Sequence, residues 1–114
     1  MNEQSLFNIL SDETRRRLLG LLLKEGELCV CELHYALDML QPKISRHLAA
    51  MREASLLWVN RDGTRIYYRL NTDMPLWAFK VLDAMAKAGK QPVLLQRDQQ
   101  RLQRMPGRPE RLAA

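Results

Sequence analysis

The fold is decided by residues 29–48, CVCELHYALDMLQPKISRHL. In the first half of this stretch, apolar residues recur at the i, i+3, i+7 spacing of one helix face, at Val30, Leu33 and Leu37. This spacing predicts a short helix over 29–37.

The second half of the stretch predicts another helix, over 43–54. Pro42 is well placed in its first turn, because the missing N–H would have no partner there. Ile44, Leu48 and Met51 mark its apolar face. Two short helices joined by a tight turn form a helix-turn-helix.

Strand-forming residues dominate 56–61 and 65–70, which flank Asp62-Gly63-Thr64. A glycine-containing turn between two such runs is a strong hairpin signal. Because the hairpin follows a helix-turn-helix, we predict a winged helix-turn-helix, mainly α-helical with a β-hairpin wing.

Helical patterns also flank this unit. We expect helices over about 12–24 and 76–88, with a shorter helix before the first. The later helix has a wide apolar surface for so small a protein, which indicates a homodimer interface. Its apolar residues are Trp77, Val81, Leu82 and Met85. We divide the chain into a winged helix-turn-helix and dimerisation domain, 1–90, and a basic C-terminal extension, 91–114, which is partly helical and then disordered from Pro106.

Length and composition limit the class of protein. With 114 residues, 46% of them hydrophobic and 27% charged, the chain fits a single small globular unit without a separate catalytic module. The leucine-rich run 18–23 is far shorter than the roughly 18 residues needed to span a bilayer, and the N-terminus has no signal-peptide pattern. We therefore expect a cytoplasmic protein with no membrane partner. It contains no Ser-His-Asp set or phosphate-binding glycine loop, so we predict that it is not an enzyme.

Positive charge is concentrated in two segments. The net charge is +5, and residues 43–69 and 90–114 each contain six basic and two acidic side chains. A basic balance of this kind indicates an anionic partner, which for this fold is double-stranded DNA.

The second helix and the wing carry side chains suited to reading DNA. Gln pairs with adenine and Arg with guanine, whereas Lys and Ser more often contact phosphates. We expect the DNA-binding residues to be Gln41, Lys43, Ser45, Arg46, His47, Arg61 and Arg65. Each of these taken singly could be an ordinary solvated residue, so the prediction depends on their common place in one winged unit.

Cys29 and Cys31 open the first helix of the helix-turn-helix. On a regular helix such residues lie about 200° apart around the axis, so a shared ligand requires the helix start to distort. A disulfide across this spacing would be strained, and a cytoplasmic location disfavours it further. Two thiolates suit soft metals or metalloids, although buried cysteines often act only as small hydrophobic residues. Their position directly ahead of the recognition helix favours the ligand role.

Four segments resemble the arsenical-resistance repressors of the ArsR/SmtB family. They are ELCVCEL (27–33), ALD (36–38), QPKISRHL (41–48) and YYRL (67–70). The resemblance covers roughly residues 10–88. It implies a homodimeric winged-helix repressor that binds operator DNA and is released when trivalent arsenic or antimony binds Cys29 and Cys31. No permanent cofactor is implied, because the metalloid acts as the inducer.

The chain departs from that family at two positions. His34 stands where many relatives have a third cysteine, which leaves two thiolates for a metalloid that prefers three sulfurs. Hydroxide, a small thiol such as glutathione, or His34 can take the third position. A monosubstituted organoarsenical, whose carbon already fills one of three bonds, also suits such a site. Leu40 replaces a capping Ser or Thr, so the recognition helix is expected to lack that cap.

Other chemistries fit the sequence less well. Zinc needs about four N, S or O ligands, but no histidine follows His47, and residues 1–10 contain neither Cys nor His. A thiol oxidoreductase is disfavoured because Cys-x-Cys lacks the Cys-x-x-Cys spacing. The alternative that we retain is a winged-helix repressor responding to another soft metal or to thiol oxidation.

Overall fold

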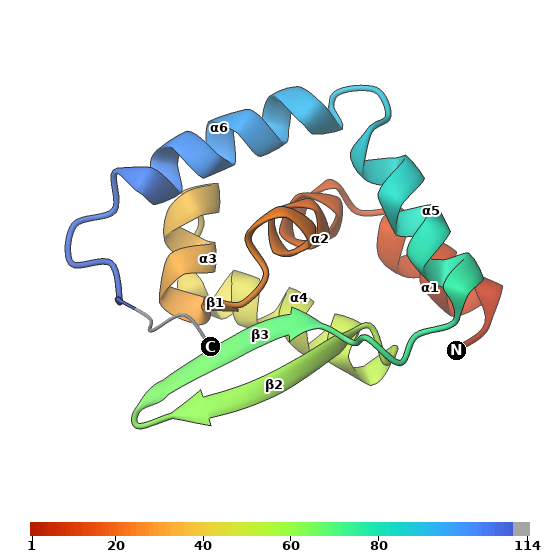
Figure 1. The fold of residues 1–114 in the computed structure, drawn as a ribbon, viewed down its shortest axis with the longest axis horizontal. Helices are drawn as coiled ribbons and strands as arrows, with labels where there is room; N and C mark the ends of the chain where they lie inside the picture. The colour runs from red at the N-terminus through yellow and green to blue at the C-terminus, as the bar shows by residue number, and fades with distance from the viewer. Residues whose placement is uncertain (111–114) are drawn as a thin grey trace.

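The predicted winged helix-turn-helix is present in the computed structural model, which describes residues 1–110. Six helices and three strands follow one another along this part of the chain (Figure 1). They are α1 (Glu3–Leu10), α2 (Glu13–Glu25), β1 (Leu28–Cys29), α3 (Val30–Leu37), α4 (Gln41–Glu53), β2 (Leu57–Asp62), β3 (Arg65–Leu70), α5 (Leu76–Ala86) and α6 (Gln91–Gln103).

Helix α2 forms the centre of the hydrophobic core, and the other five of these helices pack around it (Figure 1). Its fully buried leucines are Leu18, Leu19, Leu21 and Leu22. The helix begins where the sequence predicts, because the Asp12 side chain accepts a hydrogen bond from the Arg15 backbone N–H at 3.1 Å.

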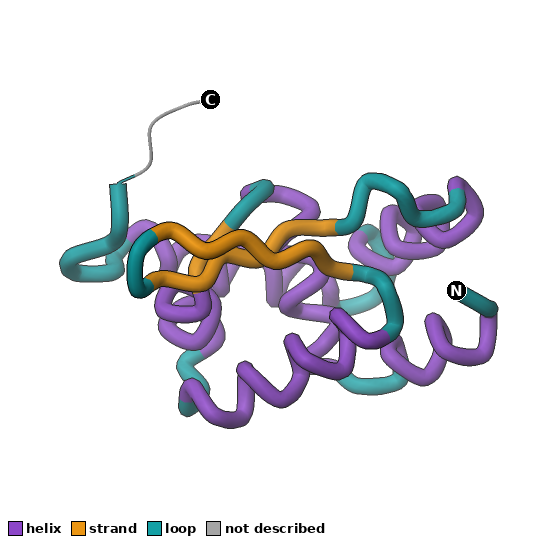
Figure 2. The backbone as a smooth tube through the Cα atoms, turned by 90° about the horizontal axis from the view of Figure 1, so that it is seen from below, coloured by secondary structure: helices purple, strands orange, loops and turns teal. Residues whose placement is uncertain are grey.

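The wing is an antiparallel hairpin of β2 and β3, and it has the expected turn. Asp62 pairs with Arg65, and Gly63 between them has φ +62°, a conformation that glycine adopts without strain. A third strand, β1, pairs with β3 and opposes Cys29 to Tyr67, so the strand order is β1-β3-β2. Figure 2, viewed from the hairpin side, shows these strands in front of the helices.

The apolar surface predicted for α5 divides between the core and the solvent. Leu82 is fully buried, and Val81 and Met85 pack against the core, so these three residues do not form an outer face. The large apolar side chains that remain exposed on α5 and α1 are Leu76, Trp77, Phe79 and Phe7. Both helices lie at the same end of the molecule (Figures 1 and 2).

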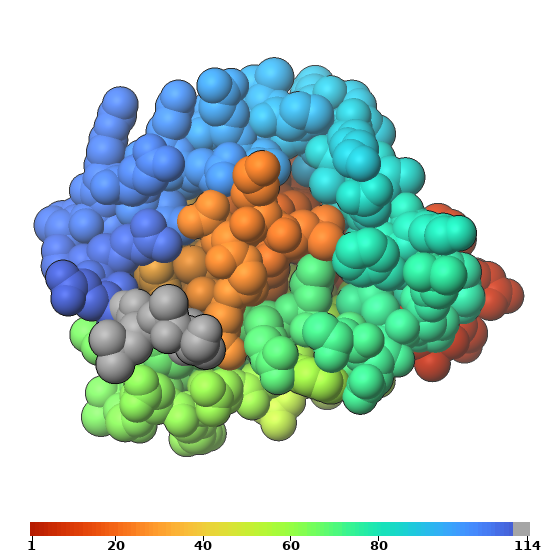
Figure 3. All heavy atoms as spheres, viewed as in Figure 1, coloured from red at the N-terminus to blue at the C-terminus, as the bar shows by residue number. Residues whose placement is uncertain are grey.

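Helix α6 packs against α2 and α3, and its Leu102 is buried in the core. Arg17 of α2 and Asp98 form an ion pair of 2.8 Å, with side chains only 12% and 2% exposed. Residues 106–110, which belong to the end predicted to be disordered, return toward α3. Figure 3 shows this blue segment against the orange segment that leads into α3. The rest of that predicted end, 111–114, lies outside the described residues.

Candidate functional site

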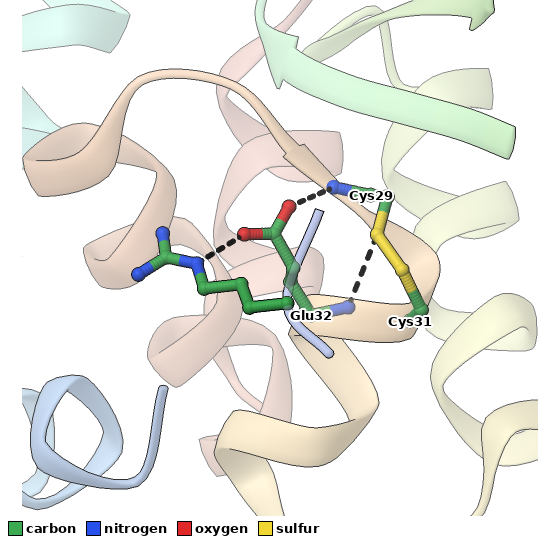
Figure 4. The surroundings of a disulfide bond; sticks show 4 residues. Cys29, Cys31 and Glu32 are labelled. Atoms are coloured by element: carbon green, nitrogen blue, oxygen red, sulfur yellow. Dashed lines mark hydrogen bonds and ion pairs between the residues drawn. A yellow bond between two sulfur atoms is a disulfide. The ribbon is translucent and has the colours of Figure 1, made fainter. Parts of the chain in front are cut away.

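The two cysteines lie where β1 meets α3 (Figure 4). Cys29 is the N-cap of α3, with extended backbone at φ −79° and ψ 161°, and Cys31 is the second residue of the helix. Because Cys29 lies outside the helix, the angular separation expected for two helical residues does not apply. The two Cα atoms are 5.2 Å apart, and the sulfurs form a disulfide bond. The expectation that this spacing disfavours a disulfide is therefore wrong for this structure.

Glu32 holds Cys29 through a reciprocal capping box. The Glu32 backbone N–H donates to the Cys29 Sγ at 3.3 Å, and the Cys29 backbone N–H donates to the Glu32 Oε1 at 3.0 Å. Both residues are 1% exposed. Glu32 is not among the residues predicted from the sequence, although a glutamate three residues after the cap position is the signal of this motif. The motif is hard to recognise in this sequence because cysteine stands in place of the usual serine or threonine.

Both cysteines line an open pocket of about 240 Å³ to which two other segments, the start of α4 and the wing, also contribute. Beyond the cysteines, α3 contributes His34, the start of α4 contributes Gln41, and the wing contributes Thr64 and Arg65. Within residues 1–110, no group of three or more His, Cys, Asp or Glu side chains is arranged to hold a metal ion. His34 lines the same pocket as the two cysteines.

Helix α4 presents three of the predicted DNA-contacting side chains to solvent. Gln41, Lys43 and Arg46 are exposed, and Ser45 is half-buried. All four lie in the first two turns of the helix, which is the part of a recognition helix that contacts base edges.

His47 lies differently, against the start of α2. Its Nδ1 accepts a hydrogen bond from the Arg15 Nε at 3.1 Å. Burial lowers the pKa of His47 below its usual value of 6.5, and the positive charges of Arg15, Lys43 and Arg46 lower it further, while the Asp12 carboxylate acts in the opposite direction. The imidazole is therefore a neutral acceptor at neutral pH.

The start of α4 has no side-chain cap, as the sequence predicts. Leu40 occupies the N-cap position, is 80% exposed and makes no capping hydrogen bond. Asp38 does not replace it, since no side chain makes a capping hydrogen bond to α4. The Asp38 carboxylate lies 3.4 Å from the Arg101 guanidinium. A helix N-terminus without a side-chain cap is a favourable place for a phosphate.

The wing keeps two of its arginines exposed near the turn, Arg61 and Arg65. Arg69, farther from the turn, is engaged within the protein. Its guanidinium stacks over the Trp58 ring at 4.5 Å from the centroid and lies 3.8 Å from the Glu27 carboxylate. Arg61 and Arg65 are therefore the wing arginines best placed to contact a ligand.

The helix-turn-helix, the exposed basic residues of α4 and the charged wing define a winged-helix transcriptional regulator. Residues 12–57 match the family model described as "Bacterial regulatory protein, arsR family". The arsenic resistance transcriptional regulator ArsR1 of Pseudomonas putida is 46% identical over 105 residues, which cover 92% of this chain and 80% of the relative. The chain therefore belongs to the ArsR family, whose members are DNA-binding transcriptional regulators and not enzymes.

Two further comparisons agree with this assignment. The arsenical resistance operon repressor of Escherichia coli is 54% identical over 78 residues, or 68% of this chain and 67% of the relative. The crystal structure of the AntR antimony-specific transcriptional repressor matches with a TM-score of 0.61 and 28% identity, over 83% of this chain and 78% of that chain.

No helix among residues 1–110 is both long and apolar enough to cross a membrane.

Proposed function

We propose that this protein is a cytoplasmic repressor that binds operator DNA as a homodimer and is released when a trivalent arsenical or antimonial binds the Cys29 and Cys31 thiolates. The names of two relatives and of one solved structure support arsenic or antimony as the inducer. One observation carries the proposal: the cysteine pair shares its pocket with Gln41 and Arg65, two of the residues expected to contact DNA.

In this proposal α4 enters the major groove and the wing contacts the adjacent backbone or minor groove. Exposed Gln41, Lys43 and Arg46 contact base edges and phosphates, together with Ser45 and His47. The wing adds Arg61 and Arg65. A dimer would place its two recognition helices about 34 Å apart, which favours an imperfectly palindromic operator.

The exposed apolar side chains of α1 and α5 support the homodimer. Phe7 is 55%, Leu76 67% and Phe79 45% exposed. Aromatic and aliphatic side chains of this size gathered at one end of a small protein indicate a surface that another subunit covers.

Cys29 and Cys31 are suited to couple the inducer to DNA because of where Cys29 lies. Its backbone pairs with Tyr67 of β3, the strand that runs from the wing tip, and its side chain caps α3, the helix that leads into α4. The disulfide shows that the two side chains reach one place, and in this proposal reduction leaves two thiolates there that hold one ion. A bound trivalent metalloid supplies one bond to each sulfur. A change in the Cys29 side chain therefore acts on the wing and on α3 together.

The third position on the metalloid is open in this proposal. The pocket has space beside the sulfurs, and His34 and Arg65 lie on its wall. Hydroxide, a small thiol or His34 can occupy that position. An organic substituent on arsenic fits equally well, which makes a monosubstituted organoarsenical a candidate inducer.

Release from promoter DNA tests the proposal. Labelled DNA from the protein's own promoter is bound under reducing conditions, and arsenite, antimonite, methylarsenite, zinc and cadmium are titrated while fluorescence anisotropy is recorded. We expect release by the trivalent metalloids only, and none from a Cys29→Ser/Cys31→Ser variant. Release by zinc or cadmium alone, or by none of the five, would rule out the metalloid assignment.

A second candidate is a repressor that senses thiol oxidation, and the disulfide between Cys29 and Cys31 favours it. In that reaction the two thiols lose two protons and two electrons to an oxidant such as hydrogen peroxide, which is reduced to two waters. The same DNA-release assay separates the candidates. If the protein senses thiol oxidation, peroxide releases the DNA and dithiothreitol reverses this release.

A further inference from the structure

The basic C-terminal extension has no role in the proposed function, yet one of its arginines reaches the cysteine site. The Arg108 Nε donates to the Glu32 Oε2 at 2.7 Å, and the Arg108 guanidinium lies 3.8 Å from the Glu25 carboxylate. The Arg108 side chain is 34% exposed and that of Glu32 only 2%. Arg108 is therefore bound to a buried carboxylate and is not simply a solvated cation.

Glu32 connects Arg108 to the cysteine pair. One carboxylate oxygen accepts the Arg108 guanidinium N–H, and the other accepts the Cys29 backbone N–H at 3.0 Å (Figure 4). A buried carboxylate is stable only when its oxygens are paired. The Glu32 side chain is thus held from both sides, and it in turn fixes the backbone of Cys29.

Helix α6 delivers this arginine to the site. The Arg101 Nε donates to the Tyr35 carbonyl at 3.1 Å, and its guanidinium stacks over the Tyr35 ring at 4.9 Å. The buried pair of Arg17 and Asp98 ties α6 to α2. With α6 fixed along α3, the chain that follows it returns to the first turn of α3, where Glu32 lies.

We propose that Arg108 is a positioning residue of the sensor: through Glu32 it holds Cys29 in the orientation that brings the two sulfurs together. This inference rests on the proposed function, because it assigns Arg108 to the same cysteine pair. Residues that orient a metal ligand from the second layer of a site typically change metal affinity about 10- to 100-fold when replaced. The loss of Arg108 therefore weakens inducer binding and leaves the chemistry of the thiolates in place.

Arsenite-driven release of operator DNA from the full-length protein measures this effect. We expect Arg108→Ala to raise the arsenite concentration at half-release by about 10-fold, and Arg108→Lys to raise it less. Arg104→Ala is the matched control, because Arg104 is an exposed arginine four residues earlier and its replacement removes the same charge. The control should leave the midpoint unchanged.

A double variant separates positioning from a general loss of stability. If Arg108 acts through Glu32, adding Arg108→Ala to Glu32→Gln shifts the midpoint no further than Glu32→Gln alone. A merely structural arginine would lower the melting temperature and leave the arsenite midpoint unchanged. An unchanged midpoint in Arg108→Ala, or additive effects of the two substitutions, would overturn the proposal.

Hydrogen exchange at the Cys29 amide provides a readout that does not depend on arsenite. This N–H donates to Glu32, so Arg108→Ala should speed its exchange several-fold compared with Arg104→Ala. If arsenite fails to release the wild-type protein, the proposed function is wrong and the exchange rate still tests the contact. Equal exchange rates in the two variants would show that Arg108 does not position Cys29.

Discussion

The starts of α3 and α4 are built in opposite ways, although the two helices are neighbours in one helix-turn-helix. At α3, the Cys29 side chain caps the helix, Glu32 returns the hydrogen bond, and Arg108 binds Glu32. At α4, exposed Leu40 occupies the cap position, and its side chain makes no hydrogen bond to the helix. The start of the helix that follows Cys29 is therefore fixed by side-chain contacts, and the start of the helix expected to bind DNA has no side-chain cap.

This difference separates the two tasks of the proposed repressor. A site that responds to an inducer must be fixed by contacts that a bound ion can alter, and the start of α3 has such contacts with the wing strand and with the C-terminal segment. A helix start that accepts a phosphate must keep its N–H groups free of side-chain acceptors, as α4 does. Substitutions at the two helix starts measure how much stability the contacts of α3 provide and how much the missing cap of α4 costs.

The largest expected effect is a loss of stability when the buried ion pair between Arg17 of α2 and Asp98 of α6 is broken. Asp98→Ala leaves Arg17 buried without its partner, and breaking a buried pair in this way costs about 3–5 kcal/mol. Arg17 also donates to the Leu37 carbonyl at the end of α3, at 3.5 Å. Urea unfolding measures the loss. The exposed pair of Asp83 and Lys87 is the control, and Asp83→Ala should change stability by less than about 1 kcal/mol.

The cap of α3 is tested by two substitutions of one residue. Cys29→Ala removes the acceptor for the Glu32 N–H and should lower the free energy of unfolding by about 1 kcal/mol under reducing conditions. Cys29→Ser keeps an acceptor and should stay within about 0.5 kcal/mol of the reduced wild type, since serine is a good N-cap. Equal stabilities of the alanine and serine variants would contradict a capping role for Cys29.

The open start of α4 is tested by supplying the cap that it lacks. Leu40→Ser gives the first turn an acceptor, and because Leu40 is 80% exposed little packing is lost. We expect a gain of about 1 kcal/mol in thermal or urea unfolding. If the substitution is neutral or destabilising, the start of α4 is already satisfied by other means.

The smallest expected effect is a dependence on pH from His47. Since its pKa in the folded protein lies below 6.5, the unfolded chain binds more protons between that lowered value and 6.5. The free energy of unfolding therefore falls as the pH is lowered through this window, and the full contribution of His47 is present above pH 6.5. Urea unfolding at pH 7 and pH 5.5 should show a larger loss for the wild type than for His47→Asn. Equal losses would show that His47 is not the group responsible.

Local sequence patterns were sufficient to predict the helix-turn-helix and the wing. Spaced apolar residues mark α3 and α4, and Gly63 marks the turn of the hairpin, because each signal arises within a few residues of the structure it predicts. The missing cap at Leu40 was also visible in the sequence, since a cap depends on one side chain at one position.

The surroundings of the cysteines could not be predicted in this way, because distant segments build them. Strand β1 is two residues long and forms only against β3, which is about forty residues away in the chain. This pairing draws Cys29 out of the helix and makes the disulfide geometry possible. The contact of Arg108 with Glu32 spans 76 residues, and no pattern of charge in the C-terminal extension indicates which arginine would find a buried partner.

The affinity for operator DNA with and without saturating arsenite tests the central claim most directly, in the wild type and in Cys29→Ser. The serine variant keeps the cap of α3 and removes one thiolate, so it isolates the chemistry of the sensor from the stability of the helix. We expect arsenite to raise the Kd of the wild type about 5- to 150-fold, the usual range of coupling between two sites, and to leave that of Cys29→Ser unchanged. An equal response of both proteins, or no response of the wild type, would contradict the assignment of Cys29 and Cys31 as the sensor.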